Sequence, residues 1–309
     1  MLWSEDYQKL IEVADLAKHN GYADDYNLTL KKSIAYKEMG KYPDGVNLIE
    51  TNKHYLDSTK ISHLYNEMLI LNKSRAVTFY YSPTFFDYKS LKPQHLFYVD
   101  YSFKIKRQIF IPRLNYAYRF GTSDLLLESD YYRLFNNGQY LYANFGVSLL
   151  NKLFPDYRGG LEFYSPIGNS MEASIGGRYL YAGNNNIYIL TGHLSKYVNN
   201  FWFSLRPYYA IQNTKNTITI AAHARYYEAN PINYWGLELL YGTSPDERAM
   251  ILQSTDVKLL NSYRIKIEKN VAVFKTNEIK LTSAYTYEEY DKGKYGNRFT
   301  LEVFLKHKF

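Results

Sequence analysis

Apolar and polar residues alternate with a period of two over most of this chain. In the segment 298–309, Leu301 and Leu305 lie on one face, and Glu302 and Lys306 lie on the other. A period of two places successive side chains on opposite faces of a β-strand, so the two faces of this strand meet different surroundings. The pattern predicts a sheet with one apolar and one polar side.

Fourteen segments with this alternation follow one another after residue 75. An average soluble strand has about 5–6 residues, whereas a strand that crosses a bilayer needs about 9–11, and most of these segments have the greater length. Turn-forming residues such as Asp291-Lys292-Gly293 separate them. The segments are 76–87, 94–106, 108–120, 124–134, 138–150, 156–165, 169–182, 185–197, 199–212, 216–228, 233–243, 255–268, 277–288 and 297–309.

We therefore predict a mainly β protein, a transmembrane antiparallel up-and-down β-barrel of about fourteen strands. Counts of twelve and sixteen also fit, because the stretch after Ser244 does not divide clearly. A terminal aromatic residue, here Phe309, commonly ends the closing strand of an outer-membrane barrel. A soluble β-sandwich is the alternative, and the strand length argues against it.

Residues 1–74 show helical spacing instead. Apolar residues recur as in Leu10, Val13 and Ala17, and the pattern predicts four helices near 5–19, 24–39, 43–55 and 58–73. The segment 34–46 resembles the inter-helix turn of a tetratricopeptide repeat. A simple helical hairpin bundle is the alternative. We expect a small all-α domain at 1–74 and a barrel at 75–309.

Composition supports a membrane barrel. Tyrosine occurs 35 times among 309 residues, and its ring has one apolar and one polar end, which suits the membrane interface. No apolar run is long enough for a transmembrane helix. The first residues lack the basic and apolar regions of a signal peptide, so we expect either that such a segment has been removed or that the chain is a fragment.

Charge and cysteine content exclude other classes. The net charge is +7, but the basic residues are spread along the chain among acidic ones, without the basic stripe of a nucleic-acid binder. We therefore expect no nucleic-acid partner. The absence of cysteine excludes disulfides and thiolate metal sites, and we expect no metal or cofactor.

Strand register predicts which charged residues face the barrel lumen. An arginine at the lipid midplane costs about 2–4 kcal/mol, so in 216–228 Ile218 and Ile220 face lipid while His223 and Arg225 face inward. We expect Glu162 and Glu172 to approach Arg178. The predicted lumen charges are Arg113, Arg119, Glu128, Asp130, Arg158, Glu162, Glu172, Arg178, Arg206, His223, Arg225 and Glu238, with Asp100, Lys104, His193 and Glu302 on the same side.

These inward residues have two interpretations. The charges form either a salt-bridge network that braces the barrel wall or a path for a ligand. Inward aromatic residues either stack on sugar rings or fill a narrow lumen. The candidates for sugar stacking are Tyr142, Tyr164, Trp202, Tyr208 and Tyr227.

Several runs resemble the YaiO-type outer-membrane β-barrel proteins. They are Leu153-Phe154-Pro155-Asp156-Tyr157-Arg158-Gly159-Gly160 and the runs 172–180, 200–208 and 241–247. The resemblance covers roughly 80–309. It implies an outer-membrane location among lipid and lipopolysaccharide, with the helical domain in the periplasm. It also implies a plan similar to that of polysaccharide export porins, and it supplies no catalytic residue.

Three functions follow from these observations. The favoured one is passage or organisation of a polysaccharide at the outer membrane, with residues 1–74 docking a periplasmic protein partner. The second is a structural barrel whose lumen is sealed by salt bridges. The third is a lipid-modifying enzyme that uses His193 or His223 with Ser195 or Ser204; because the chain has no Gly-x-Ser-x-Gly or His-Glu-x-x-His motif, we expect a protein that is not an enzyme.

Overall fold

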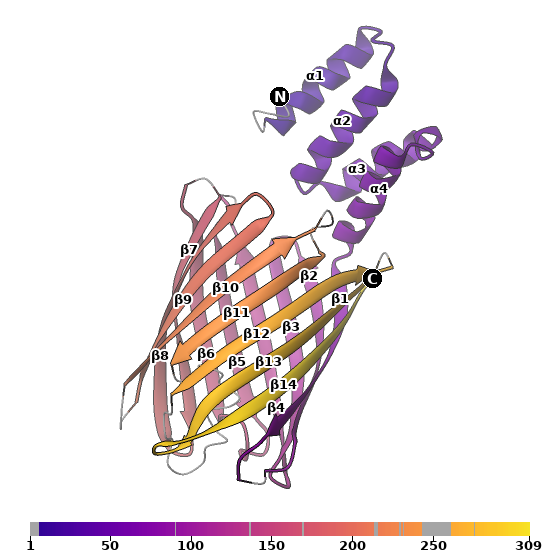
Figure 1. Cartoon of the computed structure of the whole chain (residues 1–309). Helices are drawn as coiled ribbons and strands as arrows, with labels where there is room; N and C mark the ends of the chain where they lie inside the picture. The colour runs from indigo at the N-terminus through magenta and orange to yellow at the C-terminus, as the bar shows by residue number, and fades with distance from the viewer. Residues whose placement is uncertain are drawn as a thin grey trace. The chain divides into compact units, whose positions relative to one another are not determined.

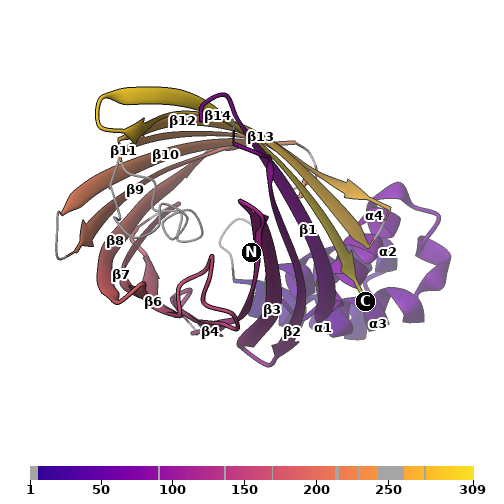
Figure 2. The same ribbon diagram turned by 90° about the horizontal axis from the view of Figure 1, so that it is seen from below.

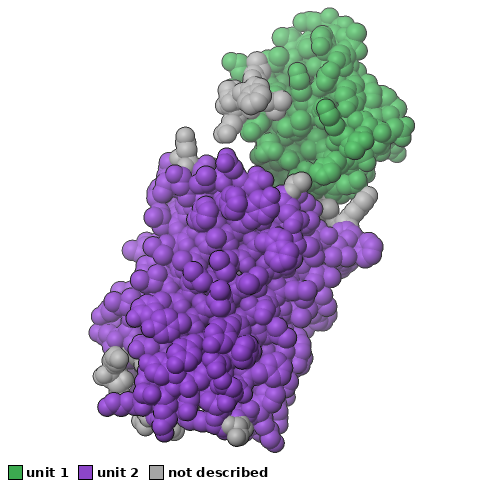
Figure 3. Space-filling model, viewed as in Figure 1, with its two compact units in different colours: residues 1–74, 308–309 green, residues 75–307 purple. Residues whose placement is uncertain are grey.

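The structure, a computed structural model, divides into two compact units. One comprises residues 1–74 with 308–309, and the other comprises residues 75–307 (Figure 3). The structure describes residues 6–89, 91–135, 137–168, 170–212, 216–228, 230, 232–242, 261–274 and 276–309.

The larger unit is a closed barrel. Within the described residues, fourteen strands pair in chain order and β1 closes the ring with β14 (Figures 1 and 2). Neighbouring strands from β1 to β14 are antiparallel along the chain, which confirms the predicted fold class and the count of fourteen. The strands are β1 Arg75–Phe86, β2 Gln94–Ile105, β3 Gln108–Arg119, β4 Thr122–Leu134, β5 Tyr140–Ser148, β6 Tyr157–Pro166, β7 Met171–Ala182, β8 Asn185–Val198, β9 Phe201–Ile211, β10 Thr217–Tyr227, β11 Tyr234–Gly242, β12 Ser262–Val273, β13 Asn277–Asp291 and β14 Lys294–Lys308.

The side chains of the barrel are arranged inside out relative to a soluble protein. In β8, Tyr188 and Leu190 are 51% and 55% exposed on the outer face. By contrast, Asn115 and Thr286 face inward and are almost fully buried. Lipid would surround the apolar outer face of a membrane barrel, whereas the polar inner face finds its partners inside the barrel.

Most predicted strands match the structure to within three residues at each end, and β12 departs furthest from its prediction. The strand expected at 255–268 is β12 at Ser262–Val273, and the predicted residues 5, 169, 243 and 255–260 lie outside the described part of the chain. The strand expected at 297–309 begins three residues earlier, at Lys294, because Lys292 and Gly293 form a tight hairpin turn with a Gly293 φ of 72°.

Because the number of antiparallel strands is even, the barrel begins and ends at the same rim. β1 begins and β14 ends at one rim, which we call the N/C rim. The other, here the opposite rim, carries the connections 87–93, 120–121, 149–156, 183–184, 212–216, 243–261 and 292–293.

The smaller unit contains four α-helices within the described residues. They are α1 Tyr7–His19, α2 Asp25–Glu38, α3 Tyr42–Thr51 and α4 Thr59–Asn72, with a short 3₁₀ turn η2 at Lys53–Tyr55. Asp24 caps α2 by accepting a hydrogen bond from the backbone N–H of Asn27 at 3.0 Å. None of the described helices is both long and apolar enough to span a membrane.

The helical unit has its own apolar core. Ile49, Ile61 and Met68 are completely buried where α3 meets α4. Leu10 and Ala35 form a second cluster between α1 and α2. These positions follow the helical spacing of the sequence, and the resemblance to a tetratricopeptide repeat stays a prediction.

Candidate functional site

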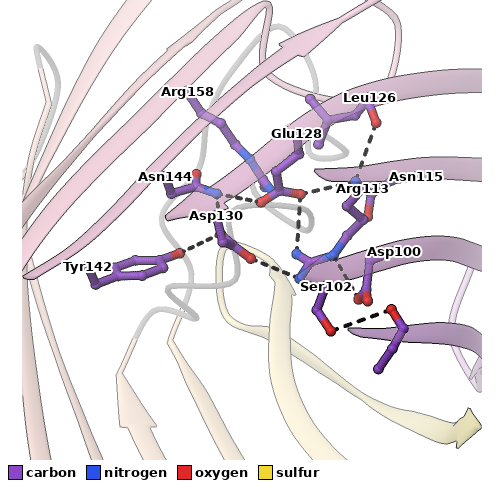
Figure 4. A network of polar contacts seen from close by, with 11 residues as sticks. Asp100, Ser102, Arg113, Asn115, Leu126, Glu128, Asp130, Tyr142, Asn144 and Arg158 are labelled. Carbon is purple, nitrogen blue, oxygen red and sulfur yellow. Dashed lines mark hydrogen bonds and ion pairs between the residues drawn. The ribbon is translucent and has the colours of Figure 1, made fainter. Parts of the chain in front are cut away.

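The first group of lumen charges surrounds Arg113 on β3. Its guanidinium lies 3.6 Å from Asp100 on β2, and 3.5 and 2.9 Å from Glu128 and Asp130 on β4 (Figure 4). One cation is therefore shared by three carboxylates on the neighbouring strands, and further donors are needed to balance them.

Those donors come from β3, β5 and β6. Glu128 accepts hydrogen bonds from the amide of Asn115 at 3.0 Å and that of Asn144 at 2.9 Å, and it forms an ion pair with Arg158 (Figure 4). The hydroxyl of Tyr142 donates to Asp130 at 2.9 Å. Buried carboxylates with this many partners hold the wall in one arrangement.

The second group joins β6 to β9. Arg206 donates to Glu162 at 2.7 Å and to the hydroxyl of Tyr164 at 2.9 Å, and Ser174 also donates to Glu162. The guanidinium of Arg178 lies 5.8 Å from the ring centre of Tyr208, and the expected approach of Arg178 to Glu162 and Glu172 stays a prediction. Glu162 and Arg206 form an ion pair although β7 and β8 lie between their strands. The spacing of residues in the sequence did not predict this pair.

Glu172 lies beside this group at the start of β7. It accepts a hydrogen bond from the hydroxyl of Tyr140 at 3.3 Å, and its carboxylate is 3.8 Å from Nδ1 of His193. Tyr140 stacks on Tyr164 with ring centres 4.3 Å apart. Both predicted glutamates are thus engaged with the wall of the barrel.

The third group lies on β10, β11 and β12. Glu238 is 2.7 Å from Arg264, 3.4 Å from Lys266 and 3.1 Å from His223. Next to it, Arg225 donates to Glu268 at 3.0 Å. Here three basic side chains share one carboxylate, the reverse of the arrangement around Arg113.

Alternation along each strand places the predicted lumen charges and aromatics on the same face as the buried polar residues of the barrel, and their role as a network or a sugar site stays a prediction. The aromatic residues differ in surroundings. Trp202 carries the guanidinium of Arg225 at 5.1 Å from its ring centre, and Tyr208 packs against the apolar cluster around Leu180. Tyr142 and Tyr164 are hydrogen-bonded as described, whereas Tyr227 lines a cavity. Four of the five candidates for sugar stacking are therefore packed against the wall.

The lumen contains a cavity of about 440 Å³ in the half nearer the N/C rim, which we call the large chamber. Its lining combines aromatic rings with charged and hydroxyl groups. The lining includes Tyr98, Tyr227, Tyr234, Phe304, Lys280 and Lys306.

A second cavity, of about 90 Å³, lies in the half nearer the opposite rim, and we call it the small chamber. Basic side chains dominate its charged lining. They are Arg119, Arg264, Lys266 and Arg298, with Glu302 as the carboxylate in the lining and with several hydroxyl groups between them.

An apolar cluster contributes residues to the lining of both chambers. Tyr80 stacks on Tyr98 at 4.4 Å and meets the edge of Phe304 at 4.6 Å between ring centres. Leu153 and Phe154, from the connection 149–156, are 6% and 2% exposed in the same cluster. We call this set the aromatic waist. Tyr98 and Phe304 line the large chamber, whereas Tyr80 lines the small one.

Asp124 holds the connection 149–156 in this inward position. One of its oxygens accepts hydrogen bonds from the backbone N–H groups of Lys152, Leu153 and Phe154 at 3.0, 2.7 and 2.9 Å. The hydroxyl of Ser148 donates to the same carboxylate at 3.0 Å. Asp124 was not among the residues predicted from the sequence. The apolar run Leu153-Phe154-Pro155 in a rim connection, together with an acidic residue on the inward face of a nearby strand, could have indicated it.

The histidines do not assemble with a serine. Ser204 is the cross-strand partner of both Ser195 and His223, yet among the described residues no hydrogen bond joins either serine to His193 or His223. Across the same residues no group of three or more histidine or carboxylate side chains is arranged so that it could hold a metal ion.

Comparison with known proteins gives a family and a fold. The family model described as "YaiO membrane beta barrel domain" matches residues 74–247. No curated protein matches the chain. Two solved structures with the same fold are the CymD monoaromatic hydrocarbon channel and a bacterial polysaccharide outer membrane secretin.

The two structures are similar in architecture and distant in sequence. CymD has a TM-score of 0.53 and 8% identity, covering 80% of this chain and 90% of its own. The secretin has a TM-score of 0.50 and 8% identity, covering 77% of this chain and 99% of its own. At such identity the similarity shows the fold alone.

Proposed function

Because the chain belongs to the YaiO membrane β-barrel family and is an outer-membrane β-barrel, we propose that it takes part in the passage or organisation of a polysaccharide at the outer membrane. The large chamber carries this proposal. Its volume of about 440 Å³ is within the roughly 300–1,000 Å³ range of small-molecule sites. A chamber of this size takes a short stretch of a saccharide chain.

The lining of the large chamber suits a saccharide. Tyr227 offers its ring to the apolar side of a sugar, and Lys280 and Lys306 offer donors to its hydroxyl groups. Tyr98 is already stacked on Tyr80, and the guanidinium of Arg225 lies 4.6 Å from the ring centre of Tyr234. One of the two similar barrels is described as a polysaccharide secretin; that description belongs to the other protein, and the proposal rests on the chamber.

The orientation in the membrane is part of the proposal. Bacterial barrels have short periplasmic turns and longer extracellular loops. The longest connection, between Gly242 on β11 and Ser262 on β12, is at the opposite rim. We therefore place the opposite rim outside and the N/C rim in the periplasm, where residues 1–74 would dock a periplasmic protein.

A structural barrel is the second candidate function. The aromatic waist and the fully engaged carboxylates around Arg113 favour a lumen that carries no solute. Both candidates are non-enzymatic. The proposal assigns no catalytic step to His193 or His223, which are held beside Glu172 and Glu238.

Conductance of the full-length protein in planar bilayers separates the two candidates. Passage predicts a small steady conductance that neutral or acidic oligosaccharides block. It also predicts a larger conductance for Phe154→Ala, because that change removes a buried ring from the aromatic waist. Leu150→Ala is the matched control, since Leu150 is in the same connection but 47% exposed.

Folded protein with no conductance in either form would contradict passage and leave the structural barrel. Heat-modifiable mobility in gels serves to establish folding. A conductance that oligosaccharides do not block would contradict a saccharide as the solute.

A further inference from the structure

The small chamber gathers four basic side chains from three different strands. Arg119 comes from β3, Arg264 and Lys266 from β12, and Arg298 from β14. We propose that this chamber is an anion-binding site. It would take a small oxyanion or the ionised group of an acidic saccharide, and the saccharide form of the proposal rests on the function proposed above.

The local carboxylates leave an excess of positive charge. Glu238 serves both Arg264 and Lys266, in addition to His223. The single negative charge of Glu238 balances only one of the two positive charges of Arg264 and Lys266. Glu288 lies 3.3 Å from Arg298 and balances that charge, and Glu302 adds one carboxylate to the lining. Three carboxylates therefore face four basic side chains. An anion in the chamber would complete the balance where water exclusion makes charge interactions strong.

Hydrogen-bond donors in the lining suit an oxyanion. Ser82, Thr84 and Thr286 are buried hydroxyl residues of the chamber, with 5%, 8% and 2% exposure. In addition, Nε of Arg298 is buried and has no hydrogen-bond acceptor among the described residues. Guanidinium and hydroxyl donors that converge from several strands are the usual means of holding carboxylate and phosphate groups.

The size of the chamber limits what it takes. Its volume of about 90 Å³ is enough for a few water molecules. This suits a phosphate or carboxylate group and is well below the roughly 300 Å³ at which small-molecule pockets begin. A saccharide would therefore insert its ionised group here while its rings stay outside the chamber.

Calorimetric titration of the full-length protein in detergent tests the site. The probes are inorganic phosphate and glucuronate, with glucose as the uncharged control. We expect phosphate and glucuronate to bind and glucose not to bind. Lys266→Gln should weaken phosphate binding by about tenfold, as expected for one charge-assisted contact, while Arg264 still holds Glu238 at 2.7 Å.

Lys269→Gln is the matched control because Lys269 is on the outer face of the same strand, with its ammonium 4.7 Å from the ring centre of Trp235. It should leave phosphate affinity unchanged. A second variant, Arg298→Gln combined with Glu288→Gln, removes a chamber cation without leaving an unpaired carboxylate, and it should also weaken binding.

Each outcome decides the proposal. Absence of phosphate and glucuronate binding overturns it, as does binding that Lys266→Gln and the double variant leave unchanged. Phosphate binding without glucuronate binding supports the anion site and overturns the acidic saccharide. Because binding is measured without conductance, a barrel that carries no solute and still binds phosphate keeps the anion site and contradicts only the passage function.

Discussion

The carboxylate of Asp124 lies 2.7 Å from the backbone nitrogen of Leu153, which is 29 residues later in the chain. This contact, with the equivalent ones to Lys152 and Phe154, turns a rim connection inward and completes the aromatic waist. An ionised acceptor with several N–H donors forms stronger hydrogen bonds than a neutral one. The Asp124 side chain therefore accepts three of the hydrogen bonds that hold this connection in its inner position.

Asp124→Ala should release the connection 149–156 from the lumen. Trypsin cleaves after Lys152, and we expect cleavage there to accelerate roughly tenfold or more as local opening becomes easier. Mass spectrometry of timed digests of the folded protein measures this. Asp156→Ala removes a carboxylate from the same connection and should leave the rate unchanged. Equal rates for wild type and Asp124→Ala would show that apolar packing alone holds the connection.

Glu162→Gln should destabilise the barrel by about 3–5 kcal/mol, because it leaves the buried guanidinium of Arg206 without its charge partner. Urea unfolding in lipid vesicles, followed by tryptophan fluorescence, measures this cost. Adding Arg206→Met should recover most of the loss, since no unpaired charge then remains. A double variant as unstable as Glu162→Gln would refute the coupling.

Gly176→Ala should impair barrel assembly, whereas Gly177→Ala should be tolerated. A methyl group on Gly176 would lie 2.5 Å from the backbone oxygen of Leu161 and 2.7 Å from Cα of Glu162. On Gly177 the nearest atom would be the oxygen of Ile189 at 3.6 Å, an ordinary contact. Overpacking against backbone costs about 1–3 kcal/mol or more. The heat-modifiable fraction on gels is the readout, and similar fractions for both variants would contradict the prediction.

Asp24 should make α2 sensitive to acid. Hydrogen bonds from Asn27 lower the pKa of Asp24 below its ordinary value near 3.8. The stabilisation is therefore present above that ordinary value and is lost as the pH falls through the lower folded pKa. Amide hydrogen exchange of 25–38 in the full-length protein should be faster in Asp24→Ala than in wild type at pH 6.

That difference in exchange should shrink as the pH is lowered through the folded pKa. Asp57→Ala, which removes an exposed carboxylate elsewhere in the helical unit, should behave as wild type. A gap that persists unchanged at the lowest pH would mean that the Asp24 carboxylate does not act through its charge.

The wall of the barrel was predictable from sequence because lipid and lumen impose opposite demands on alternate residues. In β10 the alternation of Ile218 and Ile220 with His223 and Arg225 is enough to assign both faces. The predicted bounds of β12 were wrong because no clear alternation marks the start of this strand after the connection that follows Gly242.

The contacts inside the lumen were less predictable than its lining. Glu162 and Arg206 meet because long side chains reach past two strands within a curved wall, and a linear pattern carries no information on that curvature. Asp124 was missed for a related reason. Its partners are backbone N–H groups of a rim connection, and backbone groups cannot be recognised as partners from the types of the residues that carry them.

The pairing of β1 with β14 has a consequence for how the protein is assembled. Thr84 and Thr300, whose hydroxyl oxygens lie 3.1 Å apart across this seam, are separated by 216 residues. A barrel without the seam has two free edges, and in lipid each unpaired backbone group costs several kcal/mol. No intermediate with thirteen strands can therefore rest in the bilayer by itself. The chain has to be kept from aggregating until every strand is available, and insertion and closure become a single slow event governed by the longest-range contact.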